Sequence, residues 1–125
     1  MEVAFRHTIV LVADVRASRD FYERVLGLTV TDDFGTIVFF EGGLALHDGP
    51  DLRRKIFKRG DFPEEPEGRN NLEIYLETPQ LDDCLARVQA SGGEIIHPIE
   101  RQEWGQHVFR FFDPDGHVVE IGEPQ

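Results

Sequence analysis

The sequence has a single cysteine, Cys84, among its 125 residues. One thiol cannot form an intrachain disulfide or a thiolate zinc site, so neither a disulfide framework nor a zinc finger is expected. The longest purely aliphatic run, Ile9 to Ala13, is too short for a membrane span or for the core of a signal peptide. We therefore expect a cytoplasmic protein without a membrane segment.

Glycine motifs that mark well-known catalytic and cofactor sites are also absent. No two glycines lie two residues apart, which excludes the dinucleotide-binding fingerprint. No Gly-Lys-Ser/Thr occurs, which excludes a phosphate-binding P-loop, and no Gly-x-Ser-x-Gly occurs, which excludes the nucleophile elbow of hydrolases. The function must therefore rest on a different kind of site.

Basic residues are few compared with acidic ones. The chain has 13 Lys and Arg against 24 Asp and Glu, which gives a formal net charge of −11. Such a surface repels nucleic-acid phosphates and anionic lipids, so we expect neither nucleic acid nor a membrane as a partner. Hydrophobic residues make up 40% of the chain, an ordinary share for a globular protein.

The two halves of the chain have the same predicted order of elements. In the first half the sequence predicts a strand at 8–13, a helix at 16–26 and strands at 28–31, 36–41 and 44–47. In the second half it predicts a strand at 72–77, a helix at 81–88 and strands at 94–99, 106–112 and 117–122. The order βαβββ thus occurs twice, which predicts an α+β fold. Residues 1–125 then form one domain, with module one at about 5–48 and module two at about 71–123.

A polar segment at 49–70 separates the modules and is predicted to be a linker loop. It contains three prolines and shows no periodic apolar pattern. Its basic tract, residues 53–59, has three interpretations. It is an amphipathic surface turn with Ile56 and Phe57 packed inward, a lid that holds an anionic substrate, or part of a dimer contact.

Four potential metal ligands occupy related places in the two modules. His7 opens the first strand of module one and Glu73 opens that of module two, while His47 and Glu120 end the last strands. If the modules pack about a pseudo-two-fold axis, these positions converge on that axis. Two imidazoles and two carboxylates would then surround one cation, which would offset the cost of burying two carboxylates. The sequence therefore predicts a metal site.

Three segments carry a resemblance to a known family. They are His7-Thr-Ile-Val-Leu-Val12, Phe21-Tyr-Glu-Arg-Val-Leu-Gly-Leu28 and Phe109-Arg-Phe-Phe-Asp-Pro-Asp-Gly-His-Val-Val-Glu120. With them, the sequence resembles the vicinal oxygen chelate superfamily, which includes glyoxalases, bleomycin-resistance proteins and extradiol dioxygenases. The resemblance implies two tandem βαβββ modules that form a curved mixed sheet around a cleft. It also implies a divalent metal ion (Ni, Zn, Mn, Co or Fe) at positions matching His7, His47, Glu73 and Glu120.

The function that the resemblance implies is a metal-dependent lyase or isomerase of glyoxalase type. Its small substrate would chelate the metal through adjacent oxygens, and a catalytic glutamate would shuttle the proton, with Glu120 as first choice and Glu73 as second. The sequence departs from glyoxalase I because His47 and Glu73 stand where that enzyme has a carboxylate and, often, a histidine. We also expect a homodimer, since members of the superfamily commonly form one.

Other functions stay open. A metal-free antibiotic-binding protein of the bleomycin-resistance type is one alternative, and a ring-cleaving extradiol dioxygenase is another, although the latter expects histidine at Glu73. A thiol transferase that modifies an antibiotic is a third. Four side chains are candidates for contact with a substrate, with ordinary packing or solvation as the alternative: Tyr75, Trp104, Gln106 and Arg110. Three further histidines are expected to be structural or at the surface: His97, His107 and His117.

Overall fold

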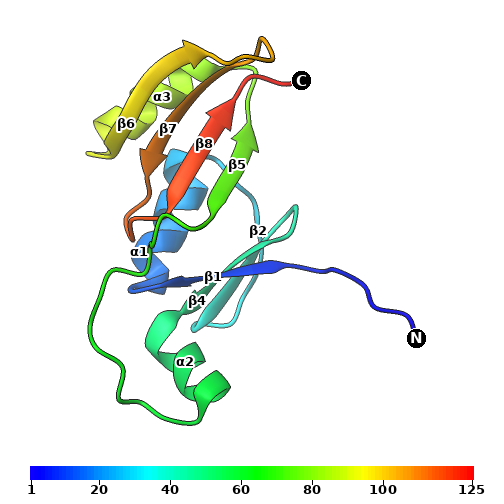
Figure 1. Cartoon of the computed structure of the whole chain (residues 1–125), viewed down its shortest axis with the longest axis vertical. Helices are drawn as coiled ribbons and strands as arrows, with labels where there is room; N and C mark the ends of the chain where they lie inside the picture. The colour runs from blue at the N-terminus through cyan, green and yellow to red at the C-terminus, as the bar shows by residue number, and fades with distance from the viewer. The chain divides into compact units, whose positions relative to one another are not determined.

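The computed structural model describes all 125 residues, which divide into two compact units, 1–65 and 66–125. Each unit has a four-stranded mixed sheet and a helix that joins the first strand to the second (Figure 1). The predicted α+β class and the two βαβββ modules are therefore confirmed. The strands belong to two separate four-stranded sheets, neither of which is closed.

Unit one holds the first sheet. Its elements are β1 (Thr8–Val12), α1 (Val15–Asp20), the π-helix η1 (Phe21–Val25), β2 (Val30–Asp33), β3 (Ile37–Phe40), β4 (Leu44–Asp48) and α2 (Gly49–Phe57). The strand order is β1-β4-β3-β2. β1 and β4 run parallel, while the other neighbours are antiparallel.

Unit two repeats this topology. Its elements are β5 (Glu73–Glu77), α3 (Leu81–Ala90), β6 (Glu94–Arg101), β7 (His107–Phe112) and β8 (Val118–Gly122). The strand order is β5-β8-β7-β6, again with a parallel pair, β5 and β8, followed by antiparallel ones. The identical strand order and direction show that the βαβββ pattern is a true internal repeat.

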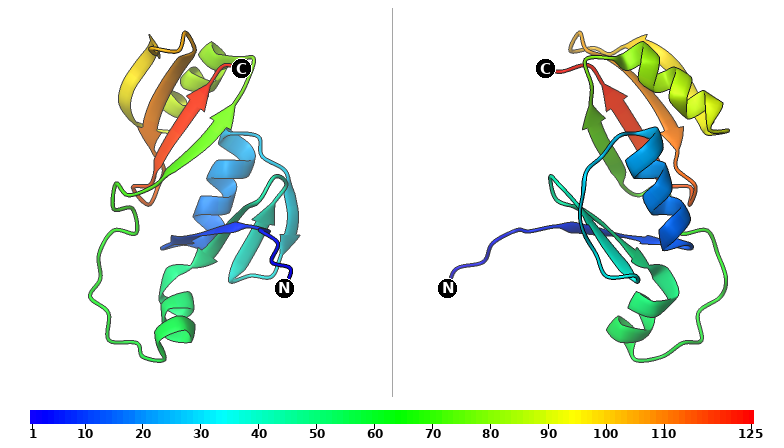
Figure 2. Two further views of the ribbon diagram at one scale, coloured as in Figure 1. Left: turned by 45° about the vertical axis from the view of Figure 1, so that its right-hand side comes forward. Right: turned by 180° about the vertical axis from the view of Figure 1, so that it is seen from behind.

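One face of the sheet in unit two forms the core of that unit. Figure 2 shows α3 lying across this face, to which the helix contributes buried Leu81 and Val88. The strands contribute buried apolar residues: Ile74, Phe109, Phe111, Val119 and Ile121. Since side chains alternate along a strand, the neighbouring residues Glu73, Tyr75, Arg110 and Glu120 lie on the opposite face. We call this second face the polar face of unit two.

Strand β1 is less buried than its sequence suggests. Its run of aliphatic residues predicts burial on both faces, but only Val10 and Val12 are buried, while Ile9 is 43% exposed. The strand alternates between a core-facing and an open side, as expected for a sheet covered on one face. The prediction that β1 is buried on both faces is therefore wrong.

The helix predicted at 16–26 consists of two parts. Asp14 caps α1 by accepting a hydrogen bond from the backbone N–H of Ala17 (3.1 Å). From Phe21 onward the helix widens to a π-helix, in which the N–H of Leu26 donates to the carbonyl of Phe21 (3.2 Å). The chain then leaves the helix at Gly27, whose φ of 80° suits the predicted glycine terminus.

The linker predicted as a loop begins with helix α2. The Asp48 side chain caps this helix by accepting a bond from the N–H of Asp51 (2.8 Å), and Pro50 occupies its first turn. Lys55 lies one turn after Asp51 and pairs with its carboxylate at 2.7 Å. Capping and ion pairing therefore make a helix where the absence of an apolar period predicts a loop.

The inward packing predicted for the basic tract is also wrong. Ile56 and Phe57 are 56% and 58% exposed, so neither is packed into the core of unit one. Helix α2 ends at Lys58, which adopts a left-handed conformation with φ 61°. None of the helices combines the length and the hydropathy that a membrane span requires.

Candidate functional site

The two modules can be aligned through their helices. Asp14 and Gln80 are the N-caps of α1 and α3 and lie 66 residues apart. His7 and Glu73 are separated by the same 66 residues. His7, immediately before β1, therefore corresponds to Glu73, the first residue of β5, as the sequence predicts.

Strand register extends this alignment to the neighbouring strand. Ile9 pairs with Ala45, and Tyr75 pairs with Glu120. Since Ile9 and Tyr75 are again 66 residues apart, Ala45 is the residue of module one that corresponds to Glu120. On the next strand, Phe39 pairs with Ala45 and Arg110 pairs with Glu120, so Phe39 corresponds to Arg110.

The predicted equivalence of His47 and Glu120 is wrong by two residues. His47 pairs with Leu11, and the matching pair in unit two is Glu77 with Gly122. The last hairpin is longer in unit two, because Ala45 follows Phe39 by six residues whereas Glu120 follows Arg110 by ten. His47 thus occupies the position of Gly122.

The two histidines of unit one lie at different ends of their strand pair. His7 is exposed and packs against the ring of Phe39, with 4.8 Å between the ring centroids. His47 is buried, and its Nε2 lies 3.0 Å from a carboxylate oxygen of Asp51. His7 lies beside Gly43, which precedes His47 by four residues in the chain. At about 3.3 Å per residue, His7 and His47 are therefore roughly 13 Å apart along the strands. They do not form one site within this unit.

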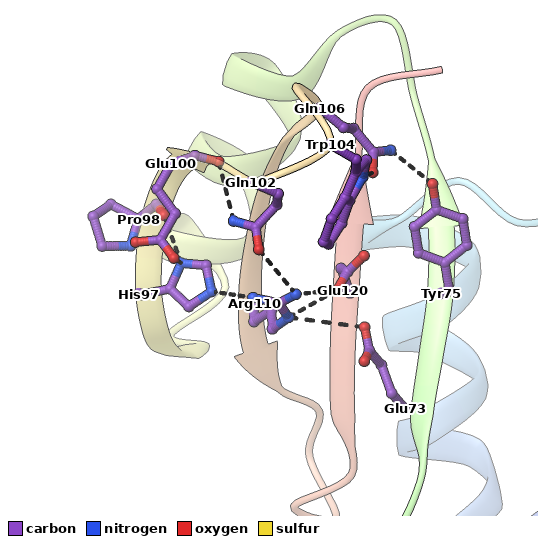
Figure 3. Close-up of polar contacts among 10 residues, drawn as sticks. All are labelled: Glu73, Tyr75, His97, Pro98, Glu100, Gln102, Trp104, Gln106, Arg110 and Glu120. Carbon is purple, nitrogen blue, oxygen red and sulfur yellow. Dashed lines mark hydrogen bonds and ion pairs between the residues drawn. The ribbon is translucent and has the colours of Figure 1, made fainter. Parts of the chain in front are cut away.

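The polar face of unit two brings its candidate residues together. Tyr75, Glu120, Arg110 and His97 pair in sequence across strands β5, β8, β7 and β6, so they form one row. Glu73 lies two residues from Tyr75 on the same side of β5. Figure 3 shows Glu73, Glu120 and His97 directed toward Arg110, whereas the hydroxyl of Tyr75 points toward Gln106.

Arg110 makes the central contacts of this row. Its Nε and Nη2 lie 2.7 and 2.6 Å from Oε1 of Glu120, a carboxylate that is only 6% exposed. Its Nε is 3.8 Å from Glu73, and its Nη1 is 2.9 Å from Nε2 of His97. Gln102 accepts a longer bond from Nη2 at 3.5 Å. One guanidinium thus balances two carboxylates.

The two carboxylates also affect each other. A hydrogen bond to Glu120 raises the pKa of Glu73 to about 7, and burial and the negative charge of Glu120 act in the same direction. The charge of Arg110 opposes this increase. Near neutral pH, Glu73 therefore takes up and releases a proton readily, which is a property suited to acid–base chemistry.

Two exposed aromatic rings, those of Trp104 and Tyr75, lie beside Glu120 and are held by Gln106 (Figure 3). Trp104, which is 58% exposed, donates from its indole N–H to Oε1 of Gln106 (2.8 Å). The Nε2 of buried Gln106 donates to the hydroxyl of Tyr75 (2.7 Å), and that hydroxyl donates to Glu77 (2.5 Å). A chain of hydrogen bonds therefore fixes both rings.

Gly122 provides the room for this chain of hydrogen bonds. A Cβ at this position would lie 2.4 Å from Nε2 of Gln106 and 3.3 Å from the hydroxyl of Tyr75. Desolvation and the hydrogen bond to Glu77 raise the pKa of the Tyr75 phenol, so it stays protonated and keeps donating.

The residues of each unit do not by themselves fit a metal ion. No group of three or more His, Cys, Asp and Glu side chains is arranged to hold one. In unit two, Arg110 already balances Glu73 and Glu120, and in unit one the position of Glu120 is taken by Ala45. The predicted set of four combines residues of both units, so it stays a prediction.

Sequence reasoning did not identify the contacts of His97 and Gln102 with Arg110. His97 is expected to be structural or at the surface, and its contact with the guanidinium of Arg110 agrees with a structural role. The strand prediction at 94–99 was correct, yet the β6–β7 register shifts on both sides of His97. Pairing rules for a regular hairpin therefore could not place it beside Arg110.

Known proteins share this architecture. A family model described as "Glyoxalase-like domain" matches residues 5–125. A protein of unknown function from Agrobacterium tumefaciens strain C58 is 42% identical, with a TM-score of 0.89 over 100% of this chain and 97% of that one. A glyoxalase/bleomycin resistance protein/dioxygenase from Nocardioides is 27% identical, with a TM-score of 0.72 over 98% and 84%.

A third structure is more distant in sequence. Lactoylglutathione lyase from Agrobacterium tumefaciens is 24% identical, with a TM-score of 0.71 over 98% of this chain and 95% of that one. Identity at this level shows a shared fold only, since one fold hosts many reactions.

Proposed function

This chain belongs to the glyoxalase-like domain family, and on that premise we propose that it binds a small organic molecule on the polar face of unit two without a protein-bound metal. This proposal favours the antibiotic-binding type of function over the metal-dependent lyase. Its supporting residues lie within one unit, namely Arg110, Glu120, Trp104 and Tyr75.

The observation that carries the proposal is the contact of Arg110 with Glu120. The guanidinium supplies a positive charge where the carboxylates of Glu73 and Glu120 converge. A metal ion at that point would have to displace an internal cation that already makes two short contacts. An organic ligand, by contrast, can add its own hydrogen bonds to this charged row without breaking it.

The exposed rings supply the apolar part of such a site. Trp104 and Tyr75 are 58% and 45% exposed, and both are held in place by Gln106. Fixed aromatic side chains lose little conformational entropy when a ligand packs on them, which makes them effective binding surfaces. We therefore expect a ligand that combines a ring or flat apolar group with hydrogen-bonding groups.

Binding can be followed through Trp104, the only tryptophan of the chain. We would titrate the protein with bleomycin and with ring-bearing amines and carboxylates while recording tryptophan fluorescence, and repeat each positive result by calorimetry, which also gives the affinity of Trp104→Ala, a variant without tryptophan. A ligand of the proposed kind should bind at least about tenfold more weakly to Trp104→Ala and Arg110→Met. Arg87→Met, which removes an exposed arginine from α3 on the opposite face of the sheet, is the matched control and should bind normally. Equal affinity in all four proteins would refute the proposal.

A second candidate function is the metal-dependent lyase or isomerase. It is favoured by the pairing of Glu73 with Glu120, because a carboxyl group with a pKa of about 7 is suited to proton transfer near neutral pH. Elemental analysis of the isolated protein, and after incubation with Ni, Zn, Mn, Co or Fe(II), separates the two functions. One equivalent of metal that is lost in both His7→Ala and Glu120→Gln would support the lyase, as would metal-dependent turnover of methylglyoxal with a thiol. Either of these results would overturn the metal-free proposal.

A further inference from the structure

A pocket of about 480 Å³ lies in unit one, where α1 and η1 meet the β2–β3 hairpin. We call it the α1 pocket. All of its lining residues lie between positions 15 and 38, so the pocket is contained within one unit and shares no residue with the polar face of unit two. Two buried valines, Val15 and Val38, form its apolar part. Its walls carry three arginines and three carboxylates: Arg16, Arg19, Arg24, Asp20, Glu23 and Asp33.

Ion pairs hold the walls of the α1 pocket in place. Arg19 joins the helix to the hairpin, because its guanidinium contacts Asp33 and also lies 3.4 Å from Oε1 of Glu23. Asp33 accepts a second bond from the backbone N–H of Gly35 (2.8 Å). The bond from Gly35 and the contact with Arg19 lower the pKa of Asp33, and the charge of Arg16 acts in the same direction. The walls are therefore charged and ordered near neutral pH.

Two opposite charges in the helical wall can still accept a ligand. Arg16 is exposed and forms no ion pair. Glu23 makes a single ion pair, with Arg19, and its length of 3.4 Å exceeds that of a good charged hydrogen bond. The two residues are seven positions apart, which is about two helical turns or roughly 10 Å. A cationic and an anionic group are thus available on the same side of the helix.

The fold does not require these charged walls, as the second module shows. Arg19 and Asp20 correspond to Leu85 and Ala86, at the 66-residue separation of the two helix caps. Glu23 lies in the π-helix η1, whereas α3 is α-helical throughout. Short π-helical insertions occur frequently at functional sites. Unit one therefore has a charged pocket and a helix irregularity that its repeat lacks.

We propose that the α1 pocket binds a small zwitterion that has a carboxylate and an ammonium group at the two ends of a short aliphatic chain. The carboxylate pairs with Arg16 and the ammonium group with Glu23, while the methylene groups lie over Val15 and Val38. A ligand with both charges is favoured over an anion or a cation, because the charges that line the pocket balance although the chain carries −11. The proposal concerns unit one alone and does not depend on the function proposed above.

The test is an NMR titration of the ¹⁵N-labelled full chain with ω-amino acids of increasing length, namely glycine, 4-aminobutyrate, 6-aminohexanoate and 8-aminooctanoate. The two longest should bind with a Kd of roughly 1 mM, an ordinary value for so few atoms, and shift the amide signals of residues 15–24 and Gly35. Glycine should bind far more weakly, because its charges are too close together to reach both Arg16 and Glu23. The proposal would be overturned if about 50 mM 6-aminohexanoate left these signals unchanged, or if glycine bound equally well.

Single-charge probes and matched variants identify the two contacts. Hexanoate and hexylamine each lack one charge and should bind at least about tenfold more weakly than 6-aminohexanoate. Arg16→Gln should reduce the affinity for 6-aminohexanoate to that for hexylamine, and Glu23→Gln should reduce it to that for hexanoate. The controls Arg6→Gln and Glu41→Gln make the same charge changes at exposed sites outside the pocket and should bind normally. Equal affinity of Arg16→Gln and Arg6→Gln for 6-aminohexanoate would overturn the assigned contact.

Discussion

The two units have the same strand order but different chemistry at corresponding positions. His7, Ile9, Phe39 and Ala45 in unit one correspond to Glu73, Tyr75, Arg110 and Glu120 in unit two. In unit one an imidazole packs against an aromatic ring, whereas in unit two a carboxylate lies near a guanidinium. Duplication of a backbone therefore does not duplicate a site.

The difference follows from the cost of burying charge. Ala45 is fully buried and neutral, so it needs no partner. Glu120 is almost as buried, and its charge is tolerated because Arg110 lies beside it. A charged pair of this kind is stable only when both members are present. The charged residues on the polar face of unit two therefore depend on one another for stability.

The largest effect on stability is expected when a carboxylate like that of Glu120 is introduced at the corresponding position of unit one. Ala45→Glu places a carboxylate at a fully buried position that faces Phe39. We expect it to lower the free energy of unfolding by about 4 kcal/mol, measured by urea denaturation, because the charge has no cation beside it.

The double variant Ala45→Glu/Phe39→Arg sharpens this comparison. It recreates in unit one the pairing of Glu120 with Arg110, so it should recover about 1–2 kcal/mol of the loss. If the double variant is less stable than Ala45→Glu, the two introduced side chains do not form the pair that Arg110 forms with Glu120.

The next largest effect is expected from removing the cation of unit two. Arg110→Met leaves the buried carboxylate of Glu120 without its counterion and should cost about 3 kcal/mol in urea denaturation. Arg110→Met/Glu120→Leu removes both charges and should cost less than the single change, because no unpaired charge is left. A double variant that loses the sum of the two single losses would show that the residues act independently.

The fold was largely predictable from the sequence. Strand alternation at 72–77, glycine turns and the repeated order of elements correctly located both helices and all eight strands of the two modules. Helix α2 was missed because it is stabilised by the Asp48 cap and by ion pairs rather than by an apolar period. The π-helix was missed because its one-residue insertion has no signal in apolar spacing.

The site was less predictable, because it depends on register. Glu73 and Glu120 were found from their strand positions, and they do lie together on one face. His47 was matched to Glu120 because the two turns differ in length, which sequence order alone does not reveal. The contact of Arg110 with Glu120 joins two strands, and His97 reaches it across a register shift. Such cross-strand contacts require the pairing of the strands to be known.

A smaller effect is expected at Gly122, whose counterpart in unit one is His47. Gly122→Ala places a Cβ 2.4 Å from Nε2 of Gln106, which must move. We expect a loss of about 1–2 kcal/mol and a change in the fluorescence of Trp104, whose indole is bonded to Gln106. Gln106→Ala/Gly122→Ala should be no less stable than Gln106→Ala, since the clash is gone; a further loss would point to another cause.

The smallest effect is the pH dependence of stability that Glu73, the counterpart of His7 in unit one, contributes. The native pKa of Glu73 is about 7, above its ordinary value of 4.5, so the native state binds this proton more tightly than the unfolded state. The stability that protonation contributes is therefore complete below pH 4.5 and is lost as the pH rises through 7. Glu73→Gln, which keeps the hydrogen-bonding shape without the charge, should have no effect at pH 4.5. At pH 8 it should stabilise the protein by about 1 kcal/mol, a small value because solvent screens this half-exposed group.

Thermal unfolding between pH 4.5 and 8 measures this difference directly. The melting temperature of Glu73→Gln should match that of the unmodified chain at pH 4.5 and exceed it by about 3–6 °C at pH 8. The control Glu77→Gln changes a neighbouring glutamate on the same face of β5 that does not contact Glu120, so its effect should not follow the same pH dependence. If the Glu73→Gln difference is constant across the range, then Glu120 does not raise the pKa of Glu73. The two carboxylates would then be independent, and the chemical contrast between the units would rest on Arg110 and Glu120 alone.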